Sequence, residues 1–371
     1  MKKSLIALAV LAASGAAMAQ SSVTLYGLAD VYVASKKVNT VTVVNGNQFA
    51  ISSQRQTGVE SGGLNGSRWG LKGSEDLGGG LNAIFTLESG FTIDNGAGSS
   101  DGLFNRQAFV GLASSGFGTV ALGRQYGAYE GVRGSFLSAQ GNSPAFDATN
   151  GTTVNQADIN AITAYDAAVI PTNAQAIAAA AVLNKQAGRI GAWAGYQVRI
   201  NNSISYTTPS FSGFKGSVVY GFGENKSATA DATKNVSASL SYANGPIGVA
   251  VVHQNDEIVQ GFHLKNTAIG GYYDFGIVKP FLSYNQAKYD GVAKQNEWAV
   301  GARAPMGAAT LVAQYAQSKG DDLGKNTSFG LSAEYSLSKR TTAYAAYNQT
   351  KVELADNNKN TVFGLGVRHA F

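Results

Sequence analysis

The last eleven residues, 361–371, constrain the fold more than any other segment. Side chains alternate there in size, so that one side of a strand would carry Phe363, Leu365, Val367, His369 and Phe371. A hydrophobic strand at a chain end leaves unpaired backbone groups and promotes aggregation in a soluble protein. A closed barrel removes that hazard, because its last strand pairs with its first. The segment therefore predicts a β-barrel that spans a membrane.

The composition supports this interpretation. Charged residues make up 14% of the chain, against roughly 25% in an ordinary soluble domain. After residue 20 there is no apolar run long enough for a membrane-spanning helix, which excludes a helical membrane protein. In lipid, only helices and closed barrels satisfy every backbone donor and acceptor. Cys is absent, so no disulfides are expected.

The N-terminus reads as a secretory leader. A basic start, an apolar run from Leu5 to Ala13 and a small-x-small site at 17–19 predict a signal peptide over 1–19. The mature chain, 20–371, is then expected to form a single barrel domain. Its charge would be only mildly basic, which gives no argument for nucleic acid as a partner.

Segments of about ten alternating residues, the length that crosses a bilayer when tilted, recur throughout the mature chain. We expect sixteen antiparallel strands, at 23–33, 66–75, 80–91, 104–114, 116–125, 200–208, 213–223, 235–243, 246–256, 265–275, 277–288, 294–304, 307–318, 326–337, 339–351 and 361–371. Short turns alternate with longer connections, which include 35–65. This pattern fits an all-β transmembrane barrel with both termini at the turn side.

The connection 126–199 is too long for a plain link, and loops of this size are commonly functional. It carries the acidic residues Glu130 and Asp147. An Ala-rich stretch at 174–183, preceded by the cap residues Thr172 and Asn173, predicts a short helix.

Several cations lie within or beside the predicted strands. Trp69, Leu71 and Gly73 would face lipid, which turns Arg68 and Lys72 into the lumen. A lysine or arginine side chain that faced lipid near the bilayer midplane would cost roughly 2–4 kcal/mol. Two further arginines flank the long connection, Arg124 before it and Arg199 after it. Opposite Glu130 and Asp147, this cluster would create a transverse field across a narrow pore.

Signals for an enzyme are poor. The three histidines lie near no Gly-x-Ser-x-Gly turn, and none of their spacings suits a helical metal site. We therefore expect no catalytic residue, no metal and no cofactor. A barrel enzyme stays open as an alternative, as does a channel for one solute, for example a sugar, an amino acid or an organic acid. Such channels usually line the path with an aromatic slide or a dedicated pocket. Only two tyrosines, Tyr26 and Tyr32, are expected to face inward, and two tyrosines do not make a slide.

Five stretches carry a family resemblance: Val-Thr-Leu-Tyr-Gly (23–27), Ser-Arg-Trp-Gly-Leu-Lys-Gly-Ser-Glu-Asp-Leu-Gly (67–78), Phe-Asn-Arg-Gln-Ala-Phe-Val-Gly-Leu (104–112), Gly-Arg-Gln-Tyr (123–126) and Asn-Asn-Ser-Ile-Ser-Tyr (201–206). Together with Phe371 they resemble the general diffusion porins of Gram-negative bacteria, above all the beta-proteobacterial branch. The similarity extends over the whole mature chain.

This resemblance implies a homotrimer of sixteen-stranded barrels in the outer membrane, each with a third loop folded into its lumen as the constriction. Its basic wall positions match Arg68, Arg124 and Arg199, whereas Leu28 stands where some relatives are basic. The acidic loop motif of better-known relatives is not cleanly present. Outer-membrane lipid and lipopolysaccharide are the expected surroundings, and Phe371 would be read by the barrel-assembly machinery.

The expected function is passive diffusion of small hydrophilic solutes and ions through a water-filled channel. The basic side of the constriction would consist of Arg68, Lys72, Arg124 and Arg199, and its acidic side of Glu130 and Asp147. We expect a weak preference for anions, because fixed charges within about 8–10 Å of the path bias ion entry. Replacing Arg124 or Arg199 by Ser should then shift the zero-current potential toward cations.

Overall fold

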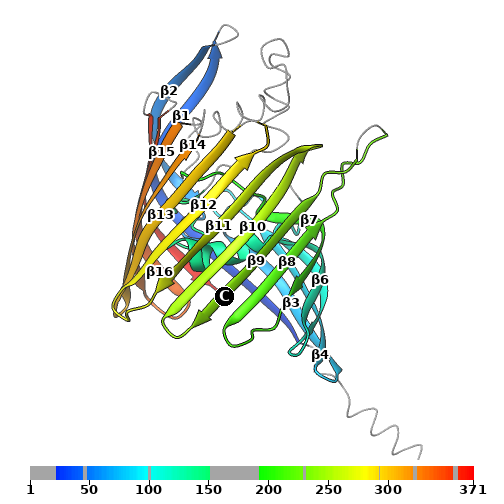
Figure 1. Cartoon of the computed structure of the whole chain (residues 1–371). Coiled ribbons are helices and arrows are strands. Elements are labelled where there is room, and N and C mark those ends of the chain that lie inside the picture. The colour runs from blue at the N-terminus through cyan, green and yellow to red at the C-terminus, as the bar shows by residue number, and fades with distance from the viewer. Residues whose placement is uncertain are drawn as a thin grey trace, which may run out of the picture.

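The computed structural model describes residues 22–44, 48–98, 102–150, 192–228, 231–291, 293–320, 324–353 and 358–371. A single antiparallel sheet closes on itself in these residues (Figure 1). The seam joins β1 (Ser22–Val44) to β17 (Asn358–Ala370), in register from Leu28–Ala370 to Lys36–Val362. The predicted leader, 1–19, and the predicted helix, 174–183, lie outside the described residues.

The other strands of the wall follow in chain order: β2 (Gln48–Ser61), β3 (Arg68–Gly78), β4 (Leu81–Gly90), β5 (Gln107–Ser114), β6 (Gly118–Tyr126), β7 (Arg199–Thr207), β8 (Phe214–Gly221), β9 (Asn235–Asn244), β10 (Ile247–Val259), β11 (Phe262–Tyr273), β12 (Lys279–Tyr289), β13 (Ala293–Met306), β14 (Ala309–Gly320), β15 (Gly324–Ser336) and β16 (Thr341–Val352). Two short helical segments stand between β6 and β7, α2 (Ala128–Val132) and the π-helix η1 (Arg133–Leu137).

The seventeen segments fill sixteen positions in the wall. β2 pairs with the loop-side half of β1, and β3 pairs with its turn-side half. These two segments therefore form one interrupted wall strand, whose break spans residues 62–67. The predicted sixteen-stranded barrel is confirmed, but the predicted loop at 35–65 is wrong. The chain continues there as a long hairpin, because residues 31–44 of β1 pair with residues 48–61 of β2.

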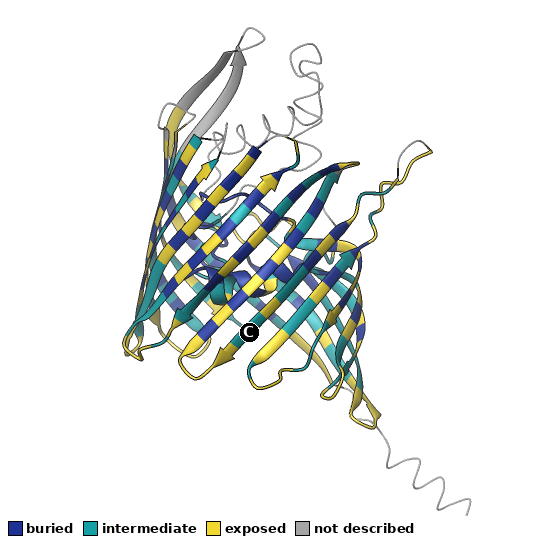
Figure 2. Cartoon of the chain, viewed as in Figure 1, coloured by how far each residue is buried: buried dark blue, intermediate teal, exposed yellow. Residues whose placement is uncertain are grey.

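Side chains alternate between the two faces of the wall, which gives the banded burial pattern of Figure 2. On β1, Val23 and Leu25 are 64% and 61% exposed on the outer face, whereas Asp30 and Tyr32 are buried on the inner face. An apolar outer face of this kind suits contact with lipid. Among the described residues, no helix is both long and apolar enough to cross a membrane.

The described part of the long connection enters the lumen. α2 and η1 lie inside the barrel in Figure 1, and they contact β9 to β12. Tyr129, Val132 and Leu137 form an apolar cluster there with Ala250 and Val252 of β10. This packing holds the first part of the connection against one side of the wall.

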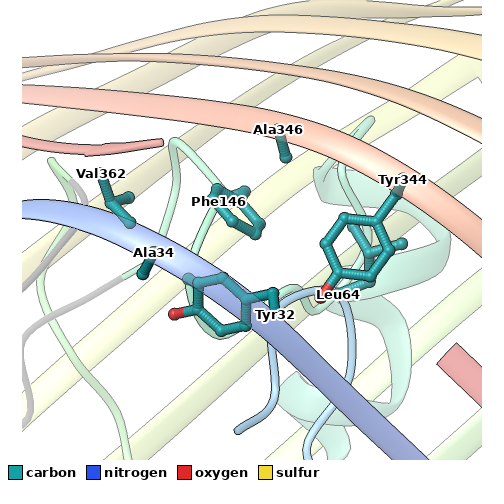
Figure 3. Packing of buried hydrophobic residues seen from close by; sticks show 8 residues of the cluster. Tyr32, Ala34, Leu64, Phe146, Tyr344, Ala346 and Val362 are labelled. Carbon is teal, nitrogen blue, oxygen red and sulfur yellow. The ribbon is translucent and has the colours of Figure 1, made fainter. Parts of the chain in front are cut away.

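The next part of the connection is anchored near the barrel seam. The ring of Phe146 packs edge-on against Tyr32 and Tyr344, with centroids 5.4 and 6.2 Å away. Leu64 and Ala346 complete this contact together with neighbouring small residues (Figure 3). The connection therefore crosses the lumen between two fixed points.

Candidate functional site: the constriction of the lumen

A cavity of about 590 Å³ separates the inner wall from the long connection, and we call it the eyelet. Its lining comes from both sides of the lumen: Asn65, Gly66, Arg68, Glu88, Arg106, Gln107, Tyr126, Val198 and Arg199 from the wall side, and Glu130, Gly131, Arg133, Asn142, Pro144 and Asn150 from the connection. Four arginines and two carboxylates thus meet at the narrow part of the barrel.

Glu88 is the centre of the charged wall. Its carboxylate lies 2.7 Å from Arg106 Nε and 3.6 Å from Arg68 Nε. It also accepts hydrogen bonds from the hydroxyls of Tyr26, at 3.0 Å, and Tyr126, at 3.4 Å. Gly70 makes room for this arrangement, because a Cβ there would lie 3.0 Å from the ring of Tyr26. Glu88 therefore fixes two guanidinium groups against the wall.

Arg199 has different surroundings. Its guanidinium lies over the ring of Tyr126, with Cζ 5.2 Å from the ring centroid. Among the described residues, no carboxylate oxygen forms a salt bridge with it, and its buried Nε has no hydrogen-bond partner. Arg199 is thus the eyelet arginine that is not neutralised by a direct ion pair.

On the loop side, Arg133 is held by Asp147. Arg133 Nη2 lies 2.5 Å from Asp147 Oδ2, and Nη1 donates to Asn142 at 3.3 Å. Asp147 is fully buried, and it also accepts hydrogen bonds from Ser138 and Thr149. Asp147 therefore anchors the connection and does not line the eyelet.

Glu130 is the carboxylate of the connection that does line the eyelet. It accepts a hydrogen bond from Asn142 Nδ2 at 2.7 Å and another from the hydroxyl of Tyr196. Burial raises the pKa of its carboxyl, and the positive charges of Arg133 and Arg199 only partly oppose that effect. Its charge is consequently sensitive to mildly acidic pH.

Of the residues predicted for the constriction, Arg68, Arg199 and Glu130 line one cavity in the structure, and their role in the constriction stays a prediction. Lys72 lies nearer the turn side, with Nζ 5.2 Å from the ring of Tyr26, and is not part of the eyelet lining. Arg124 is also outside that lining.

Arg124 lies opposite a bulge in β7, where Asn201 and Asn202 stand against this one residue. The register between β6 and β7 shifts between Gly123 and Gln125. Arg124 Nε donates to the carbonyl of Asn105 at 2.6 Å, and its Nη1 contacts Asn201. Arg124 also shares its face of β6 with Val120 and Leu122, which are 41% and 59% exposed, so strand alternation does not turn it toward the eyelet.

Three charged members of the eyelet were missed in the sequence. Arg106 stands within the stretch 104–112 that carries the family resemblance, and Glu88 falls on the inner face of its strand, so both positions held a usable signal. Nothing in the sequence indicated that Arg133 lines the eyelet, because its position depends on how the connection folds.

The arrangement suits selective passage more than covalent chemistry. The cavity holds fixed guanidinium groups and the carboxylates of Glu88 and Glu130, and such fixed charges bias which ions enter. Within the described residues, His, Cys, Asp and Glu form no group of three that could hold a metal ion.

Comparisons with known proteins all point to one protein family. Residues 5–357 match the Gram-negative porin family. The chain is 35% identical over 402 residues to outer membrane porin protein 32 of Delftia acidovorans, and 33% identical over 427 residues to an outer membrane porin protein of Bordetella pertussis, with full coverage of both chains in each case.

Solved structures agree with the sequence comparison. An anion-selective porin from Comamonas acidovorans superimposes with a TM-score of 0.70 at 26% identity, over 95% of this chain and 100% of the other. The closed barrel, the loop-lined constriction and these relatives agree, and the chain belongs to the Gram-negative porin family of outer-membrane diffusion channels.

Proposed function

We propose that this porin prefers anions while it passes small hydrophilic solutes by diffusion, without any covalent step. The observation that carries the proposal is the eyelet, where four arginines and two carboxylates line one cavity. Arg199 contributes most to the preference, because Glu88 and Asp147 already pair with the other three arginines. The anion selectivity stated for the Comamonas relative supports the same assignment.

A channel dedicated to one solute is the alternative. The eyelet lining holds a single aromatic residue, Tyr126, and that ring already lies beneath Arg199. A path of this kind offers charge but no aromatic slide, which favours general diffusion.

The zero-current potential across a planar bilayer in a salt gradient tests the preference. The wild-type channel should give an anion-selective sign. Arg199→Ser should move the potential toward cation selectivity, more at low salt than at high salt, because salt screens fixed charges. Arg124→Ser, which removes the same charge outside the eyelet, should change the potential much less. A cation-selective wild type, or equal effects of the two variants, would contradict the proposal.

We also propose that three barrels assemble into a homotrimer embedded in outer-membrane lipid and lipopolysaccharide. Small and aliphatic residues such as Ala29 and Val31 follow the outer face of β1, where a neighbouring barrel can approach closely. Light scattering of the detergent-solubilised protein should give the mass of three chains. A monomer mass, with unheated gel migration as a monomer, would refute the trimer.

A further inference from the structure

A second cavity, of about 450 Å³, lies between the eyelet and the turn-side end of the barrel. Tyr126 and Gly131 line both cavities, so a solute that leaves the eyelet on this side enters the second cavity directly. Ser210 and Gly213, in the short connection between β7 and β8, mark its turn-side end. We call this cavity the vestibule.

Hydroxyl groups from three adjacent strands form a row in the vestibule. Thr207 of β7 is in register with Ser217 of β8, which is in register with Ser239 of β9. All three residues line the cavity, and Thr207 Oγ1 lies 3.2 Å from Ser217 Oγ. The three strands lie side by side in Figure 1. Because neighbouring strands are about 4.8 Å apart, one small solute group can bridge adjacent hydroxyls of this row.

One cation stands beside this row. Lys215 lies two residues from Ser217 on β8, hence on the same face, and is in register with Ser241. Two residues correspond to about 6.6 Å along a strand, a distance that a lysine side chain can span. Among the residues that line the vestibule, Lys215 is the only charged one, and no carboxylate opposes it.

The other side of the vestibule is largely apolar. Ala128, Val132 and Phe136 of the folded connection line it opposite the hydroxyl row. The cavity therefore combines a cationic, hydroxyl-rich wall with an apolar cover, which matches a small organic anion with a short hydrocarbon body.

We propose that the vestibule is a second binding site on the solute path, for the oxyanion group, carboxylate or phosphate, of a small organic anion. Lys215 supplies the counter-charge, while Thr207, Ser217 and Ser239 supply hydrogen bonds. An anion held by the eyelet arginines leaves more readily when a second attractive site lies next to it, because conduction requires binding that is shared among several sites. The inference rests on the proposed anion preference of the channel.

Phosphate inhibition of chloride current tests this site in channels inserted in one orientation. Phosphate added at the turn side should reduce the wild-type current in a saturable way. Lys215→Gln should raise the half-inhibitory phosphate concentration about fivefold or more, as expected for one charge-assisted contact, and Lys215→Arg should largely restore it. Inhibition from the loop side should stay unchanged in both variants.

Lys226→Gln is the matched control. Lys226 lies in the connection between β8 and β9, exposed and 3.7 Å from Asp231, outside the vestibule lining. This variant removes the same charge and should leave the inhibition unaltered. Equal behaviour of the two glutamine variants would overturn the site, and so would an equal change from both sides of the membrane, which indicates a general field effect.

The hydroxyl row gives a second test with little risk to folding. Ser217→Ala and Ser239→Ala should each raise the half-inhibitory concentration about two- to threefold, in keeping with single hydrogen bonds. Unchanged inhibition in both would refute the role of the row. A cation-selective wild type would instead contradict the proposed function, so the two failures are distinguishable.

Discussion

At the residue scale, Glu88 shows how one carboxylate can organise a cationic wall. It forms ion pairs with Arg68 and Arg106. It also accepts hydrogen bonds from the hydroxyls of Tyr26 and Tyr126. These contacts keep the four long side chains from moving across the eyelet. Hydrogen bonds between ionised partners are stronger than those between neutral ones and hold their geometry better. Glu88 therefore keeps the lumen open while it reduces the positive field.

Glu130 makes the selectivity depend on pH. Burial raises the pKa of its carboxyl above the ordinary value of 4.5, so protonation begins while exposed carboxylates are still ionised. Lowering the pH removes this negative charge from the eyelet, and the zero-current potential should move toward anions. Raising the pH through the same range should reverse the change. Tyr196 and Asn142 donate hydrogen bonds to Glu130, and the positive charges that act on it are those of Arg133, Arg199 and Arg106.

Glu130→Gln is the diagnostic variant. At neutral pH this variant should already show the stronger anion preference. Its zero-current potential should then not change between neutral and mildly acidic solution. A titration of the potential with the same pH dependence in wild type and variant would assign the effect to another carboxyl.

At the element scale, the break between β2 and β3 fixes the aperture of the eyelet. Asp30 accepts hydrogen bonds from the backbone N–H groups of Gly63, Leu64 and Asn65, at 3.2, 2.9 and 2.7 Å. The carbonyl of Gly63 in turn accepts a hydrogen bond from Ser143 of the folded connection at 2.8 Å. The segment 62–67 therefore ties the connection to the barrel wall.

Asp30→Asn should loosen this link. Replacing the carboxylate weakens several charge-assisted hydrogen bonds, and we expect a local loss of roughly 2–3 kcal/mol. Open-channel current noise should rise, because the connection moves more freely in the lumen. Asp76→Asn is the control, since the carboxylate of Asp76 accepts an exposed hydrogen bond from the N–H group of Gly78 at the end of β3. Wild-type noise in Asp30→Asn would show that the connection is held without Asp30.

At the scale of the whole molecule, the barrel depends on its seam. Phe371 exchanges two backbone hydrogen bonds with Gly27, each 3.0 Å long. Its ring covers Gly27 so closely that a Cβ there would lie 2.2 Å from the ring carbon Cζ. The last residue thus extends the pairing of β17 with β1 to the end of the chain and leaves no free edge.

Deleting Phe371 should lower the amount of folded protein in the outer membrane, with little effect on the conductance of channels that do form. The two lost hydrogen bonds correspond to about 2 kcal/mol.

Gly27→Val should produce the same assembly defect, because the valine side chain takes the space of the Phe371 ring. Gly58→Val is the control, since the nearest atom to a Cβ there is 4.0 Å away. The heat-shifted band on a gel measures the folded fraction, and a wild-type fraction after the deletion would contradict this role.

The sequence by itself determined the wall of the barrel. Alternation along a strand is a local property with a period of two residues, so it located the wall strands and set which faces of β1 and β3 turn inward. For the same reason Arg68 could be assigned to the lumen from its neighbours Trp69 and Leu71 alone.

Only the tertiary structure decided which charges meet. The folding of the connection brings Arg133 into the eyelet and buries Asp147, and a bulge in β7 lies opposite Arg124, which stays outside the lining. Bulges and irregular connections follow no period, because they depend on contacts between residues far apart in the chain. The wall is therefore readable from local alternation, whereas the constriction exists only once the connection has packed against it.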